Sequence, residues 1–123
     1  MKITRKNQSI LIDKQRRLKV RYYLFKEYEI HWNRQRPNTT QEWHHHNKIH
    51  ETLFIVHGQL IARWKEGDKI CKSIVREGDI IETESTPHTF SNDSKSDVKF
   101  IVFKQVLTGK NKRNLLKSDK IVD

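Results

Sequence analysis

The chain has 123 residues, of which 34 % are hydrophobic, and carries a formal net charge of +10 with a single cysteine, Cys71. This length fits one domain that buries roughly 60–70 % of its unfolded surface, enough for a sandwich or a small barrel. With no apolar run near ~18 residues, no signal-peptide-like start and no cysteine pair, the composition excludes a membrane protein, a secreted disulfide scaffold and a two-domain enzyme, and we expect a cytoplasmic protein.

The positive charge is concentrated toward the two ends of the chain. Residues 1–36 carry 11 basic and 3 acidic side chains and residues 104–123 carry 6 and 2, whereas residues 37–103 carry 8 and 10. Because no nucleic-acid recognition motif accompanies this charge, we expect solvated ends with a weak attraction for anions. The chain accordingly divides into basic N-terminal strands (1–36) packed on the barrel or on a dimer partner, a barrel core (37–106), and a polar, basic C-terminal tail (107–123).

In chain order, most of the sequence has the two-residue hydrophobic period of β-strands. Alternation over 18–24 predicts the first clear strand, which continues over 29–32 after a bend, and residues 33–38 are expected to form a loop because they include Pro37. Further strands are predicted at 52–56, 60–64, 69–75, 80–82, 87–91 and 98–106. Short strands separated by turns predict an all-β fold, a single antiparallel β-barrel or jelly roll, with at most one helical turn at 111–117.

Five of the seven histidines lie close together in the middle of the chain. Residues two apart on an extended backbone point to the same side, so His44 and His46 are expected to project together into the barrel while His45 points outward. Glu51 follows a short turn at the entry of the next strand, and His88 is the natural fourth ligand from a distant strand. Imidazoles and a carboxylate on one wall suit a divalent transition metal ion: iron, manganese, nickel, cobalt or zinc.

Strand alternation places His45 and His50 outside the cavity or behind the ligands, unless the register slips by one residue. His57 shares the alternation of Glu51 and is expected either to line the cavity or to lie in the following turn. The alternative interpretations of the whole set are solvated side chains on strand edges, or a barrel that has the ligand residues but works without a metal ion.

The order and spacing of these residues resemble the cupin superfamily, in particular its small single-domain proteins of the cupin 2 type. The first cupin motif has His-x-His, three or four residues, Glu, six residues and Gly, and it is matched by His44, His46, Glu51 and Gly58. The resemblance covers about residues 40–104 and implies a jelly-roll barrel.

The second cupin motif begins with Gly and ends with His-x-x-x-Asn, and it is matched by Gly78, His88 and Asn92. Where the family usually has Pro-x-Gly before the histidine, this chain has Glu84 and Thr86, so the loop is shorter and differently built. The resemblance implies that one metal ion is bound by four residues: His44, His46, Glu51 and His88.

Three functions are compatible with these features. The first is a metal-dependent enzyme acting on a small molecule; the resemblance implies oxygenation or isomerisation, and the basic field favours an anionic substrate. The second is a non-catalytic module that binds or senses a small ligand. The third, a nucleic-acid-associated protein, depends on the net charge alone, and we expect neither nucleic acid nor a membrane as partner. The resemblance also implies a homodimer, and the sequence identifies no catalytic or substrate-binding residue.

Overall fold

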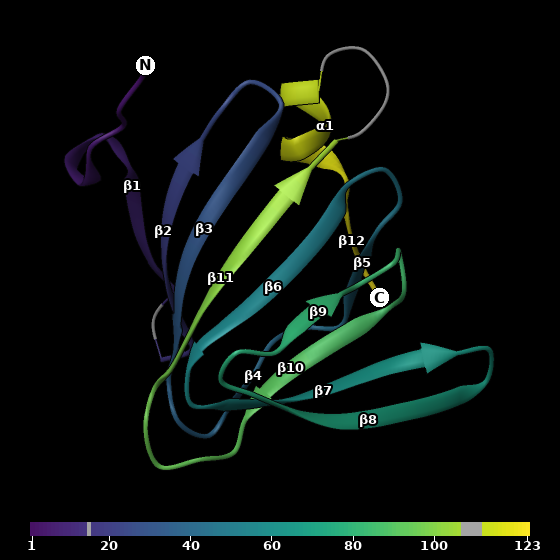
Figure 1. Cartoon of the computed structure of the whole chain (residues 1–123). Helices are drawn as coiled ribbons and strands as arrows, with labels where there is room; N and C mark the ends of the chain where they lie inside the picture. Colours follow the sequence, from purple (N-terminus) through teal and green to yellow (C-terminus); the bar gives the residue numbers. More distant parts are fainter. Residues whose placement is uncertain (15, 107–111) are drawn as a thin grey trace.

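The structure is a computed structural model that describes residues 1–14, 16–106 and 112–123 (Figure 1). Residues 107–111, where the predicted tail and helical turn begin, lie outside the described residues. The elements in chain order are a 3-10 helix (Lys6–Gln8), β1 (Ile10–Lys14), β2 (Leu18–Leu24), β3 (Tyr28–Gln35), β4 (Thr39–Thr40), β5 (His44–His46), β6 (His50–His57), β7 (Gln59–Glu66), β8 (Lys69–Arg76), β9 (Ile80–Glu82), β10 (His88–Asn92), β11 (Val98–Gln105), α1 (Lys112–Ser118) and β12 (Lys120–Val122).

The strands form two antiparallel sheets that face each other, which confirms the all-β jelly-roll fold (Figure 1). One sheet has the order β1-β2-β3-β11-β6-β9, and the other has the order β12-β5-β10-β7-β8, with β4 paired to β10. Strands β1 to β3 therefore extend the same sheet that contains β6 and β11. No helix in the described ranges is long and apolar enough to cross a membrane.

The apolar core lies between the sheets, where alternate residues of each strand point inward. Its largest fully buried side chains include Phe100, Leu53 and Ile55. A smaller cluster joins Leu116 of α1 to Ile49 and Val106. This second cluster fixes α1 against the end of the sheet, next to the strands that carry the histidines (Figure 1).

Besides the additional short strands β1, β4 and β5, two parts of the chain differ from the sequence prediction. The expected loop at 33–38 is wrong for its first three residues, because Asn33–Gln35 complete β3 and pair with both β2 and β11. The amide of Gln35 donates to the backbone oxygens of Thr39 and Phe90, both at 3.1 Å, which holds this polar end of the strand inside the protein. The other difference lies in 112–123, which form a helix and a strand where one helical turn and an irregular tail were expected.

Gly58, in the turn from β6 to β7, has a φ of +85°, and a Cβ added there would lie 3.1 Å from Cγ2 of Val98. Val98 is completely buried, so it has little room to move away. Gly67, in the turn from β7 to β8, also has a positive φ, +61°, but a Cβ there would meet nothing within 4 Å. The two glycines thus share a backbone requirement and differ in their surroundings.

We expect Gly58→Ala to lower the free energy of unfolding more than Gly67→Ala. A left-handed conformation costs alanine about 1–2 kcal/mol at either position, and overpacking against Val98 adds about 1–3 kcal/mol at position 58 alone. Urea unfolding of the two variants and the parent measures the difference. Equal losses would contradict the close packing of the β6–β7 turn on β11.

Candidate metal centre

Three strands from both sheets bring together the four residues that the sequence singled out. His44 and His46 lie on β5, Glu51 lies on β6, and His88 lies on β10 directly opposite His44. All four are buried. The two histidines of β5 face inward because they are two residues apart on an extended strand, as alternation predicts.

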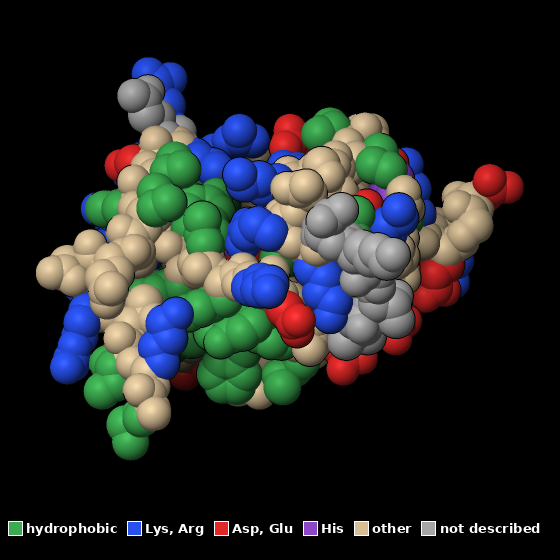
Figure 2. Space-filling model, turned by 90° about the horizontal axis from the view of Figure 1, so that it is seen from above, with side chains coloured by type: hydrophobic (Ala, Val, Ile, Leu, Met, Phe, Trp, Pro, Cys, Tyr) green, Lys and Arg blue, Asp and Glu red, His purple; other side chains and the backbone are tan. Residues whose placement is uncertain are grey.

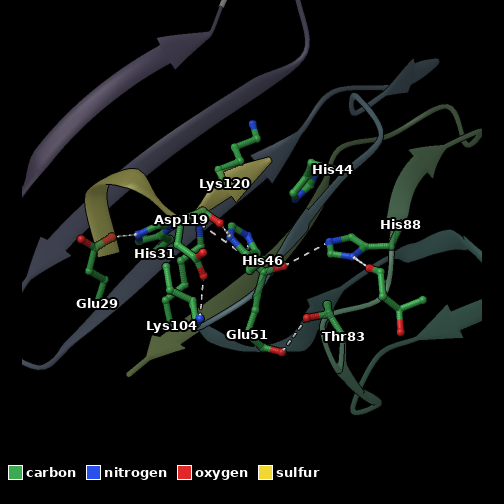
Figure 3. A network of polar contacts seen from close by, with 12 residues as sticks. Glu29, His31, His44, His46, Glu51, Thr83, His88, Lys104, Asp119 and Lys120 are labelled. Atoms are coloured by element: carbon green, nitrogen blue, oxygen red, sulfur yellow. Dashed lines mark hydrogen bonds and ion pairs between the residues drawn. The ribbon is translucent and has the colours of Figure 1, made fainter. Parts of the chain in front are cut away.

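The potential ligand atoms of His44, His46 and Glu51 all lie within 4.8 Å of one another. His88 completes the cluster, since its Nε2 is 3.5 Å from Oε1 of Glu51 and its ring centroid is 4.4 Å from that of His44. Figure 3 shows these side chains gathered around Glu51. The structure therefore brings potential ligand atoms of His44, His46 and Glu51 together and places His88 beside Glu51.

Each of the three imidazoles is oriented by a backbone carbonyl group. Nδ1 of His44 lies 2.9 Å from the oxygen of Glu42, Nδ1 of His46 lies 3.1 Å from that of Asp119, and Nδ1 of His88 lies 2.6 Å from that of Thr86. A carbonyl oxygen only accepts hydrogen bonds, so Nδ1 carries the proton in each ring. In the neutral rings Nε2 then has a free lone pair, which is the form of histidine that binds a metal ion.

The buried nitrogen and oxygen atoms of the cluster are arranged as a cation would require. Nε2 of His46 and Nε2 of His88 are buried and make no hydrogen bond. They nevertheless lie 3.2 and 3.5 Å from the carboxylate oxygens of Glu51. Lone pairs that face a carboxylate at this distance repel unless a proton or a metal ion lies between them. The donor set of three nitrogens and one carboxylate suits a first-row divalent ion.

Burial and neighbouring charged groups keep the side chains of the cluster in the protonation states that bind a metal ion. Burial by itself raises the pKa of the Glu51 carboxyl. Hydrogen bonds to His46 and His88, which form when a proton lies between ring and carboxylate, and the ammonium of Lys104 outweigh burial and hold the pKa well below its usual range. Nζ of Lys104 lies 3.6 Å from Oε2 of Glu51. Burial also lowers the pKa of His44 to about 4. At neutral pH Glu51 is thus ionised and His44 is neutral, as metal binding requires.

Residues of this cluster line two cavities. His44, His46 and Glu51 line a cavity of about 380 Å³, one wall of which is made by apolar residues of β1 and β2. His88 lines the other cavity, of about 440 Å³, together with Trp64 of β7 and residues of β9. The cluster therefore has space on two sides.

Basic side chains line the first cavity and belong to the positively charged ends of the chain. Figure 2, seen from above, shows lysine and arginine side chains gathered across the middle of this end of the molecule. The fold brings five such residues to one cavity, where three stay exposed to solvent, as expected for the chain ends, and Lys104 and Arg113 are partly buried. The five residues are Lys14, Lys104, Arg113, Lys117 and Lys120.

A second polar group, which was not predicted from the sequence, lines the same cavity. Nε2 of His31 lies 2.7 Å from Oε1 of Glu29, and both side chains are buried. Arg113 of α1 forms an ion pair with the same carboxylate and donates to the backbone oxygen of Phe25 at 3.0 Å. The sequence does contain a pattern that could have revealed this group. From Glu29 onward, every second residue of β3 is polar and buried, and the residues between them, such as Trp32, lie on the outer face.

The remaining histidines of the central cluster do not line either cavity. His45 points away from His44 and His46, as predicted, and pairs with Asp123 at 2.8 Å. His50 is only half-buried, on β6. The side chain of His57 is 63 % exposed and pairs with Glu77 at 3.1 Å, so it belongs to the turn.

Comparison with known proteins identifies the family. The family model described as a cupin domain (Cupin_2) matches residues 33–104. The chain belongs to the cupin family. The cupin match includes all four clustered residues and leaves β1, β2, α1 and β12 outside. No curated protein sequence is significantly similar to the chain.

Solved structures share the fold at low sequence identity. Capsular polysaccharide assembling protein CapF from Staphylococcus aureus has a TM-score of 0.73 at 16 % identity, over 93 % of this chain and 34 % of CapF. Oxalate decarboxylase from B. subtilis has a TM-score of 0.75 at 13 % identity, over 96 % of this chain and 31 % of that enzyme. A chain from the complex of Drosophila melanogaster CENP-C with CAL1 has a TM-score of 0.73 at 16 % identity, over 84 % and 85 %. This cupin chain thus spans about a third of the first two proteins.

Burial of His31 predicts a pH-dependent stability. Burial, assisted by the ammonium of Lys104, lowers the pKa of His31 from 6.5 to about 3. Between pH 6.5 and about 3 the unfolded chain binds a proton at His31 that the folded protein does not. The free energy of unfolding is therefore highest above pH 6.5 and falls by about 1.4 kcal/mol per pH unit as the pH drops below that value. Urea unfolding between pH 7 and 5 should show a shallower dependence for His31→Gln than for the parent. His57→Gln, at an exposed position, should keep the parental slope; an unchanged slope in His31→Gln would contradict the prediction.

Proposed function

We propose that this cupin binds one divalent transition metal ion (iron, manganese, nickel, cobalt or zinc) through His44, His46, Glu51 and His88. The observation that carries the proposal is the shared orientation of the three imidazoles. Each donates Nδ1–H to a backbone carbonyl, and the potential ligand atoms of His44, His46 and Glu51 converge, with His88 beside Glu51. A cluster of this kind is costly to bury without a cation, because its acceptors face one another.

We further propose that the protein is a metal-dependent enzyme of the oxygenase or isomerase type that acts on a small anionic molecule. A bound ion supplies a Lewis acid, and iron also supplies redox chemistry with dioxygen. The basic side chains of the 380 Å³ cavity attract an anion and orient it toward the cluster. Lys104 is the best placed of them, because it already lies beside Glu51.

His31 adds a neutral imidazole to the cavity, where it can accept a hydrogen bond from a ligand. Its Nε2–H donates to Glu29, whose charge is balanced by Arg113, so its Nδ1 has the free lone pair. Burial keeps this ring neutral at pH 7. A neutral imidazole that lines the same cavity as the metal ligands can orient a polar substrate by accepting a hydrogen bond from it.

The second candidate function is a non-catalytic module that binds or senses a small ligand. The observation that favours it is the fold of the chain from the CENP-C complex with CAL1, which is as similar to this protein as CapF is. Fold alone does not choose between catalysis and binding. A binding module would show saturable ligand affinity without product. The homodimer and the cytoplasmic location stay predictions.

Elemental analysis of the purified protein tests the metal site. We expect about one equivalent of one transition metal per chain, lost when His46→Ala and His88→Ala are combined because two of four ligands are removed. His45→Ala is the matched control: it changes the middle residue of the same triplet, whose side chain pairs with Asp123 instead, and it should keep the metal. A parent that binds none of the five ions after reconstitution would refute the proposal.

The anionic substrate class is tested with oxalate as probe and the zinc-loaded protein. We expect Lys104→Gln to weaken oxalate binding about tenfold, which corresponds to about 1.4 kcal/mol, because it removes the cation beside Glu51. Lys99→Gln, on the same strand but exposed, should bind oxalate like the parent. Isothermal titration calorimetry measures the affinities, and the zinc content of each sample is determined alongside. Equal affinities of parent and Lys104→Gln would contradict the assignment.

A further inference from the structure

Residues 112–123, which comprise α1 and β12 and which we call the 112–123 segment, lie outside the cupin match yet contact the metal centre. Strand β12 pairs with β5 along all three residues of β5, with Lys120 opposite His46 and Val122 opposite His44. On its other side β5 pairs with β10 at a single position. The strand that carries two of the ligands is therefore held mainly by this segment.

Asp119, between α1 and β12, touches the centre through both its backbone and its side chain. Its backbone oxygen accepts the Nδ1 hydrogen bond of His46 at 3.1 Å. Its Oδ2 accepts from the backbone N–H groups of Lys48 and Ile49, at 2.6 and 2.8 Å. Figure 3 shows Asp119 beside the ring of His46. Lys48 and Ile49 form the turn between His46 and Glu51, so one residue fixes the ring of one ligand and the turn that leads to the next.

The 112–123 segment is firmly attached on both sides of Asp119. Toward α1, buried Leu116 packs against Ile49, a residue of the same turn. Arg113 pairs with Glu29 on β3. Toward β12, the backbone N–H of Asp123 donates to the oxygen of Trp43 at 2.9 Å. The position of Asp119 is thus set by packing and pairing that do not depend on its own carboxylate.

We propose that Asp119 is a positioning residue for the metal centre, and that through it the 112–123 segment sets the metal affinity of the site. The inference rests on the proposed metal-binding function. Without the carboxylate, the N–H groups of Lys48 and Ile49 lose their acceptor, and the turn that spaces His46 from Glu51 is free to relax. Loss of a group that orients metal ligands typically costs 10–100-fold in metal affinity.

The test compares Co²⁺ binding by the full-length parent and point variants, followed by the visible absorption of the bound ion. We expect Asp119→Ala to weaken Co²⁺ binding 10–100-fold and to alter the spectrum, since the ligands are displaced. Asp119→Asn should restore both, because its amide oxygen accepts from the same two N–H groups. Asp123→Ala is the matched control, since that carboxylate lies in the same segment but contacts His45 outside the cavity, and it should behave like the parent.

Parental affinity and spectrum in Asp119→Ala would overturn the inference, as would an equal loss in Asp123→Ala. Should Asp119→Ala not fold, Asp119→Ser keeps one acceptor and is expected to bind Co²⁺ several-fold more weakly than the parent. A parental affinity in that variant would overturn the inference as well.

A metal-free measurement separates this inference from the proposed function. If the parent binds no Co²⁺, the proposed function fails, but positioning is still visible in the amide hydrogen exchange of Lys48 and Ile49. We expect exchange at both amides to be at least tenfold faster in Asp119→Ala than in Asp123→Ala. Nitrogen NMR should also show His46 protonated at Nδ1 in the parent. Equal exchange rates in the two variants would overturn the positioning role whether or not the protein binds metal.

Discussion

The central constraint on this structure is that a carboxylate and three imidazoles are buried together with their acceptor atoms facing one another. Such a group is stable only if every ring is held in one orientation and a cation or proton balances the lone pairs. The fold meets the first requirement with three backbone carbonyls, from Glu42, Thr86 and Asp119. Two of these carbonyls belong to residues two positions before their histidine, so local backbone geometry is enough to bring carbonyl and ring together. The third comes from a remote segment.

A second consequence of burying charge is that basic residues enter the interior with their acidic partners. Lys104 lies beside Glu51, and Arg113 balances Glu29, which in turn accepts from His31. Each buried carboxylate therefore has a positive group within reach, which is the usual condition for burying ionised side chains. Lys14 and Lys117, which also line this cavity, add positive charge that favours an anion there. The basic ends of the chain thus help to set the charge of the cavity beside the cluster.

The residues that the sequence could reveal are those whose position follows from local rules. The two-residue period of strands places His44 and His46 on one side and His45 on the other, and motif spacing adds Glu51 and His88. The same period was readable in β3, where polar residues occupy the buried face, but alternation alone does not say which face is inside. Only the pairing of β3 between β2 and β11 decides it. Contacts between distant segments, such as Asp119 with Lys48, have no local signature at all.

The two cavities differ in charge, so the two sides of the candidate metal centre are not equivalent for a charged ligand. The cavity on the side of His44 and His46 has five basic side chains, and its two carboxylates, Glu29 and Glu51, are both paired with basic residues. The cavity on the side of His88 is lined by Arg63 and by three glutamates, Glu66, Glu82 and Glu84. An anion is attracted to the first cavity and repelled from the second. Under the proposed function, an anionic ligand would reach the cluster from the side that also presents His31, so the ring that can accept a hydrogen bond and the groups that attract the ligand would act on the same molecule.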